Sequence, residues 1–211
     1  MPHARRRTSP ASLMALALGL SFAACSPRGP GSLHGLRRAH MSYVGGTRVT
    51  EVHAAPGPDS AFVFRAPAGR LLYVFFGYAH CPDICPTTLS DLRRALHRLG
   101  PDSARVDVAF VTVDPVRDSA AVLVPFTASF VRGTHALRPS TQEELATAER
   151  AFGATSSVTR TSGGEVQVSH TGAAYVVDSS GHVLVEWDYG IRPGDMAADL
   201  ALLLRLQVPP R

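Results

Sequence analysis

The chain has 211 residues, of which 45% are hydrophobic, enough to fill the core of one domain of ordinary size and to leave room for a leader. The formal charge is +4, but Arg5, Arg6 and Arg7 supply three of the positive charges, and without them the charge falls to +1. So small a charge gives no electrostatic reason to expect nucleic acid or an anionic membrane surface as a partner.

The N-terminus has the features of an export signal. An apolar run from Ala11 to Ala24 follows the arginines and is shorter than the roughly 20 apolar residues that span a bilayer. Residues 21–25, Ser-Phe-Ala-Ala-Cys, resemble the cleavage box of bacterial lipoproteins, in which the cysteine becomes the lipidated first residue. We therefore predict a lipoprotein-type signal peptide over residues 1–24, lipidation of Cys25, and a domain held at the cell membrane on its extracytoplasmic (periplasmic) side. An uncleaved anchor and ordinary signal cleavage are the alternatives.

Residues 25–46 are rich in Pro, Gly, Ser and Arg and lack apolar periodicity. This composition predicts a flexible tether, followed by a domain over residues 47–211. Outside the cytoplasm, cysteines oxidise easily unless they are protected, bound to metal or kept reduced. If Cys25 serves the membrane anchor, Cys81 and Cys85 remain as a pair without a competing cysteine.

The cysteine pair lies between a predicted strand and a predicted helix. The continuous apolar run Leu71–Phe76 predicts a central strand that is buried on both faces. Leucines then recur at helical spacing until Gly100 and Pro101 end the pattern, at Leu89, Leu92, Leu96 and Leu99.

The rest of the chain is predicted to form a strand, two helices, a β-hairpin and a closing helix. We predict strand Val106–Val113, helix Asp118–Phe130 with a kink or break at Pro125, helix Thr141–Phe152 opened by a capping box of Ser140 and Glu143, hairpin strands Ala173–Val177 and His182–Trp187, and a closing helix through Met196, Leu200, Leu203 and Leu204. This order predicts an α/β protein with a thioredoxin-like fold, in which helices flank a central mixed β-sheet.

The position of the cysteines favours reactive thiols. Pro86 suits the first position of the helix, which would make Cys85 the N-cap, where the helix dipole favours thiolate. A thiolate is both a nucleophile and a metal ligand, so we predict that Cys81 and Cys85 form a redox-active pair that can close a disulfide. A purely structural disulfide is a weak explanation, because so small a loop would stabilise the fold by only about 2 kcal/mol.

The three residues between Cys81 and Cys85 leave room for a metal ion. Soft thiolates select copper(I) or zinc, and structural zinc normally needs four protein ligands, a set that is not evident here. Two sulfurs and one imidazole would suit copper. Of the nine histidines, His80 adjoins the cysteines, His97 falls on the exposed side of its helix, and His170 precedes a strand.

Three segments of the chain form a recognisable set. They are residues 75–89, which contain His80-Cys81-Pro82-Asp83-Ile84-Cys85-Pro86, the segment Val113–Asp118, and the segment Val168–Thr171 followed by Tyr175–Asp178 and Gly181. In this order they resemble the Sco/SenC family of copper-binding, thioredoxin-like proteins. The resemblance implies that Cys81, Cys85 and His170 bind copper, as Cu(I) or Cu(II). It also implies that the protein delivers this copper to the binuclear centre in the copper-binding subunit of cytochrome c oxidase.

Several polar residues near these motifs are predicted to have supporting roles. We predict that Asp118 caps its helix and that Arg117 pairs with a nearby acid on the surface. Asp114 and His80 are candidates for supporting the ligands or contacting a partner. Tyr175 and Trp187 are expected in the core.

Two functions compete. The first is a copper metallochaperone, which is not an enzyme, and the second is a thiol–disulfide oxidoreductase that reduces the cysteines of the apo-oxidase copper site. They differ at His170, which a metal site needs and a disulfide exchanger does not. Other copper carriers or thiol reductants are further expected partners. A peroxidase is a third candidate, but the chain lacks the Thr-x-x-Cys pattern of peroxiredoxins.

Overall fold

The computed structural model describes residues 32–35, 42–54 and 58–207. These residues belong to one compact unit, Gly31–Arg211, and the predicted signal peptide and Cys25 lie outside them. Among the described residues, no helix has the length and apolarity needed to cross a membrane.

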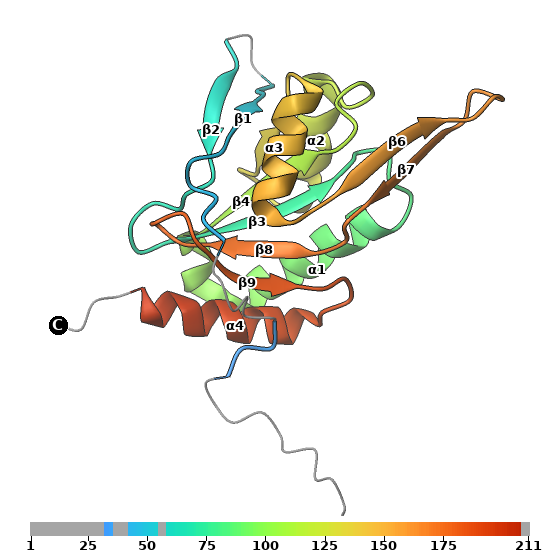
Figure 1. Cartoon of the computed structure of the whole chain (residues 1–211). Coiled ribbons are helices and arrows are strands. Elements are labelled where there is room, and N and C mark those ends of the chain that lie inside the picture. The colour runs from blue at the N-terminus through green and yellow to red at the C-terminus, as the bar shows by residue number, and fades with distance from the viewer. Residues whose placement is uncertain (1–31, 36–41, 55–57, 208–211) are drawn as a thin grey trace, which may run out of the picture. The chain divides into compact units, whose positions relative to one another are not determined.

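A seven-stranded sheet forms the centre of the unit, with the strand order β2-β1-β5-β4-β3-β8-β9 (Figure 1). Strand β3 pairs in parallel with β4 and antiparallel with β8, so the sheet is mixed, as the sequence predicts. The strands are β1 Arg48–Glu51, β2 Ser60–Val63, β3 Leu71–Gly77, β4 Val106–Thr112, β5 His135–Leu137, β8 Ala174–Val177 and β9 Val183–Trp187.

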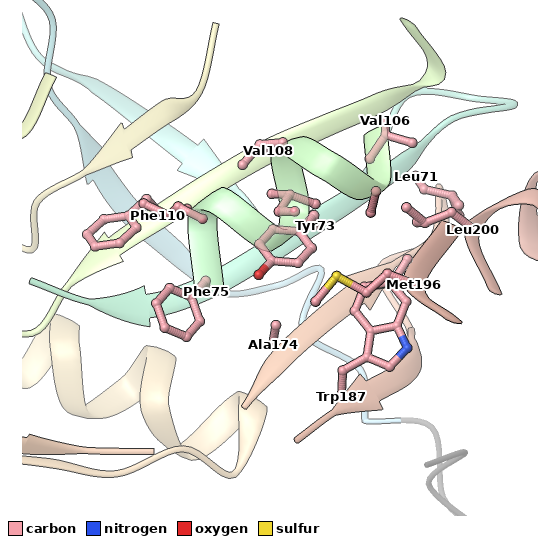
Figure 2. Close-up of a cluster of buried hydrophobic side chains, with 14 of the residues drawn as sticks. Leu71, Tyr73, Phe75, Val106, Val108, Phe110, Ala174, Trp187, Met196 and Leu200 are labelled. Carbon is pink, nitrogen blue, oxygen red and sulfur yellow. The ribbon is translucent and has the colours of Figure 1, made fainter. Parts of the chain in front are cut away.

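Both faces of the sheet are covered, because alternate residues of β3 point into different cores. Leu71, Tyr73 and Phe75 pack with helices α1, α2 and α4 in the cluster that Figure 2 shows. Leu72, Val74 and Phe76 pack with helix α3 on the other face. All seven residues of β3 are buried, which confirms the predicted inner strand. The helices are α1 Ile84–Leu99, α2 Ala120–Phe130, α3 Gln142–Phe152 and α4 Pro193–Leu206, and a 3-10 helix covers Gly100–Arg105.

Two helix starts differ from the predictions by one or two residues. Helix α2 begins at Ala120 and not at Asp118, and it continues through Pro125 without a break. For α3 the capping residue is Thr141, whose hydroxyl accepts the N–H of Glu144 at 3.1 Å. The carboxylate of Glu144 in turn accepts the N–H of Ser140 at 2.7 Å, so the reciprocal box lies one residue later than predicted.

A second, two-stranded sheet was not predicted. Strands β6 Ser156–Arg160 and β7 Val166–His170 pair antiparallel and project from the main sheet as a ribbon (Figure 1). Strand β6 is mostly exposed, and β7 alternates only two half-buried valines with exposed residues, so the hydrophobic periodicity is too weak to indicate them. This ribbon matters because His170 is its last residue.

Part of the segment expected to be a tether is packed on the fold. The buried carboxylate of Asp199 on α4 accepts the N–H groups of His34 at 2.8 Å and Gly35 at 2.9 Å, and the indole N–H of Trp187 at 2.9 Å. A Cβ on Gly35 would lie 2.4 Å from Trp187, so only glycine fits. Val44 is also fully buried. The compact unit therefore includes residues before the expected domain start at Thr47.

Candidate metal centre

Cys81 and Cys85 are placed by the end of β3 and the start of α1. Cys81 lies in the connecting loop and is partly exposed, whereas Cys85 is the second residue of α1 and is fully buried. Gly77, the last residue of β3, gives Cys85 its space, because a Cβ at this position would lie 2.8 Å from Cys85 Sγ. The tight packing of Gly77 therefore fixes the position of the buried sulfur.

The predicted helix cap at Cys85 is wrong by two residues. The N-cap is Asp83, and Pro86 occupies the third helical position and not the first. Proline is tolerated there because the first four N–H groups of a helix have no partner within the helix. Cys85 consequently points into the core, while the helix start faces Cys81. The N–H of Cys85 donates to Cys81 Sγ at 3.4 Å.

The pKa values of the two thiols are shifted in opposite directions. Burial disfavours the thiolate of Cys81, but donation from the N–H groups of Cys85 and Asp83 outweighs it, so the pKa of Cys81 is lowered. Burial raises the pKa of Cys85, and the nearby Cys81 raises it further. The expectation that the helix start favours a thiolate at Cys85 is therefore wrong, and the N–H groups of the helix start favour the thiolate of Cys81 instead.

His170 completes a group of three donors. It ends β7, and its Nε2 lies 3.6 Å from Cys85 Sγ. Its Nδ1 lies 2.9 Å from the carbonyl oxygen of Thr171, which can only accept, so Nδ1 carries the proton. Burial lowers the pKa of His170, which favours the neutral ring. The lone pair of Nε2 therefore faces the cysteines, as a metal ligand requires.

The spacing of these donors fits one metal ion. The two sulfurs and an imidazole nitrogen of His170 all lie within 4.8 Å of one another. Ligands at about 2.0–2.3 Å from a first-row ion in a trigonal arrangement lie roughly 3.8 Å apart. The observed separations therefore need only small adjustments. No other group of this kind occurs in the described part of the chain.

A cavity of about 330 Å³ opens beside the donors. Its walls include Cys81 and His170, while Cys85 lies behind them. The remaining lining residues are Tyr78, Pro82, Asp83, Ile84, Val168 and Ser169. An ion held by the three donors would be approached from the side of Cys81 and His170.

Asp118 holds the cysteine loop and does not cap a helix, contrary to the prediction. Its carboxylate is fully buried and accepts the N–H of Ala79 at 2.9 Å and the hydroxyl of Thr112 at 2.6 Å. His80 Nδ1 lies 3.1 Å from the same carboxylate. His80 is thus outside the donor group and supports the loop through Asp118.

Asp114 and Arg117 act as a pair. Asp114 accepts a hydrogen bond from Arg117 Nε, so Arg117 pairs with an acid as predicted, but that acid is buried and not on the surface. The guanidinium of Arg117 lies 5.8 Å above the ring of Tyr78. The side chain of Asp114 is therefore linked to the donor group through Arg117 and Tyr78, and Tyr78 had no predicted role.

Other sequence-based expectations about individual side chains are confirmed. Tyr175 and Trp187 are buried in the core, and His97 is exposed on α1.

Comparisons with known proteins agree with this geometry. Residues 59–205 match the model of the SCO1/SenC family. A protein of Stutzerimonas stutzeri named "Putative copper-binding protein" is 32% identical over 124 residues, which are 58% of this chain and 60% of that protein. The chain thus spans less than two thirds of that relative's length.

Solved structures of the same family share the fold. The copper-bound structure of ScoI from Bradyrhizobium japonicum is 27% identical, with a TM-score of 0.61, over 73% of this chain and 96% of that one. The apo Sco1 protein from Thermus thermophilus is 29% identical, with a TM-score of 0.64, over 84% of this chain and 98% of that one. These likenesses confirm the predicted thioredoxin-like fold, and with the matched family model they show that the chain belongs to the SCO1/SenC family.

Proposed function

We propose that the chain is a copper metallochaperone in which Cys81, Cys85 and His170 bind one copper ion. The observation that carries this proposal is the set of two sulfurs and one imidazole nitrogen within 4.8 Å. Soft sulfur ligands select Cu(I), and the imidazole helps the site to hold Cu(II) as well. The copper bound to the related ScoI supports the identity of the metal.

The acceptor in this proposal is the copper-binding subunit of cytochrome c oxidase, which would receive the ion at its binuclear centre. Transfer would proceed by ligand exchange through the 330 Å³ cavity, because Cys81 and His170 line it and Cys85 does not. An acceptor ligand that enters the cavity replaces Cys81 or His170 first. The buried Cys85 then releases the ion last.

We further propose that the protein works at the membrane. The support is the sequence of the N-terminus, with its apolar run and Cys25. A single acyl chain binds a membrane only marginally, so a lipidated Cys25 would carry more than one. A Cys25→Ser variant tests this: loss from the membrane fraction supports a lipid anchor, whereas full recovery with an uncleaved leader supports a helix.

The second candidate function is a thiol–disulfide oxidoreductase, favoured by the opposite pKa shifts of Cys81 and Cys85. In this scheme the Cys81 thiolate attacks a disulfide of the apo-oxidase subunit and forms a mixed disulfide. Cys85 then displaces the subunit's second sulfur, which leaves a Cys81–Cys85 disulfide and two reduced thiols. A separate thiol reductant would regenerate the pair.

Oxidase assembly at low copper separates the two functions. Cells that carry His170→Ala should fail to assemble active oxidase, because copper delivery needs the imidazole. Cells with Cys81→Ser should fail under either function and so provide the matched reference. If His170→Ala supports assembly while Cys81→Ser does not, the chaperone is refuted and the oxidoreductase is favoured.

A further inference from the structure

Tyr78 contacts all three candidate copper ligands. Tyr78 and Cys81 line the same cavity, where the Tyr78 hydroxyl helps to lower the pKa of Cys81. The backbone N–H of Tyr78 partly offsets the effect of burial on the pKa of Cys85. The Tyr78 ring meets the ring of His170 edge to face, with centroids 5.8 Å apart and an interplanar angle of 87°. One residue thus links the buried sulfur, the partly exposed sulfur and the imidazole.

The ring of Tyr78 is held in this position from its other side. The guanidinium of Arg117 lies 5.8 Å from the ring centroid, a distance at which a cation attracts the face of an aromatic ring. Arg117 is itself paired with the buried Asp114. The Tyr78 hydroxyl is therefore presented to Cys81 by a chain of packed and charged groups, and its position does not depend on the metal.

A hydrogen bond to a ligating sulfur has a defined effect on copper. It draws electron density from the thiolate and makes the sulfur a weaker donor. Cu(II) loses more than Cu(I) when a sulfur donates less, because Cu(II) carries the higher charge and needs more donation. Hydrogen bonding at the sulfur therefore favours the reduced ion.

We propose that Tyr78 is a positioning residue that tunes the site: its hydroxyl weakens Cys81 as a donor and so favours Cu(I), while its ring orients His170. The inference rests on the proposed copper binding and adds to it an assignment for a residue outside the ligand set. It also explains why Asp114 and Arg117 lie beside the site without reaching the ligands.

The test compares Tyr78→Phe with Tyr43→Phe in the full chain. Both changes remove one hydroxyl, and that of Tyr43 accepts a hydrogen bond from Arg65, outside the site. In Tyr78→Phe the ratio of Cu(II) affinity to Cu(I) affinity should rise about tenfold. The sulfur-to-Cu(II) charge-transfer band should move to longer wavelength, because the freed sulfur holds its electrons less tightly. Tyr43→Phe should leave both unchanged.

A second substitution isolates the ring. Tyr78→Leu removes the hydroxyl and the contact with His170 together, so it is compared with Tyr78→Phe. Cu(II) affinity should fall at least fivefold below that of Tyr78→Phe, because the imidazole that serves Cu(II) loses its support. Equal Cu(II) affinities in the two variants would refute the role of the ring.

Failure of this inference differs from failure of the proposed function. If the unsubstituted chain binds copper but Tyr78→Phe and Tyr43→Phe have the same affinity ratio and the same spectrum, the tuning role is wrong and copper binding stands. If the unsubstituted chain binds no copper, the proposed function itself is wrong. A melting temperature measured for each variant shows whether a change reflects the site or the fold.

Discussion

Gly77→Ala should damage the metal centre by moving one sulfur. The added Cβ would lie 2.8 Å from Cys85 Sγ and 2.9 Å from Phe110 Cζ, well inside normal contact distances of about 3.5–4.0 Å. Neither neighbour can retreat easily, because both are fully buried. Overpacking of this kind destabilises a fold by about 1–3 kcal/mol. Alanine also restricts the unfolded chain more than glycine does, which stabilises the fold by only about 0.4–1 kcal/mol. The steric cost is therefore the larger effect.

The expected result is a less stable protein with a weaker copper site. A net loss of about 1–2 kcal/mol corresponds to a fall in melting temperature of roughly 2–8 °C for a domain of this size. Displacement of Cys85 Sγ should lower Cu(I) affinity about tenfold or more, which anaerobic competition with a chromophoric Cu(I) chelator measures. Gly163→Ala is the matched control, because the nearest atom to its added Cβ lies 3.8 Å away. Gly77→Ala with unchanged melting temperature and Cu(I) affinity would refute the reasoning.

Three further predictions concern the ligands and the N-terminal segment. His170→Ala should weaken Cu(II) binding most, leave measurable Cu(I) binding, and hardly move the reduction potential of the Cys81–Cys85 disulfide; an equal loss for both ions, in parallel titrations, would contradict this. In the reduced, metal-free chain, iodoacetamide should modify Cys81 at a pH below the usual thiol range, and Cys85 only at higher pH, because their pKa values shift in opposite directions; mass spectrometry that finds equal rates would count against it. Asp199→Ala should leave the N–H groups of residues 34 and 35 and of Trp187 without their acceptor and destabilise the fold by about 2–4 kcal/mol; denaturant unfolding that shows no loss would show that the segment is not held there.

The sequence predicted the inner elements of the fold because their patterns are strong. Strand β3 is a continuous apolar run, and α1 carries leucines at helical spacing up to Gly100, whose φ of 65° suits glycine. The short strands β1, β2 and β5, which form one side of the sheet, have three or four residues each and too little periodicity to be recognised. The packing of His34 and Gly35 was missed because Asp199, their partner, lies far away in sequence.

The candidate site also contains residues that the sequence predicted and residues that it did not. The donors Cys81, Cys85 and His170 were assembled from residue chemistry and a family resemblance, and the structure places them together. The role of Tyr78 was not foreseen, because it follows from contacts with a ring and a sulfur that no spacing rule encodes. Asp118 was taken for a helix cap because it stands next to a helix start. Its side chain turns instead toward the loop that contains Cys81.

Anaerobic copper titration tests the central claim most directly. The reduced full chain with Cys25→Ser should bind one Cu(I) per molecule, since the described residues contain one group of soft donors. Cys81→Ser and Cys85→Ser should each abolish tight binding, because a hydroxyl is a poor ligand for a soft ion. X-ray absorption of the loaded chain should report two sulfurs and one nitrogen at the metal. Unchanged Cu(I) affinity in both cysteine variants would contradict the account.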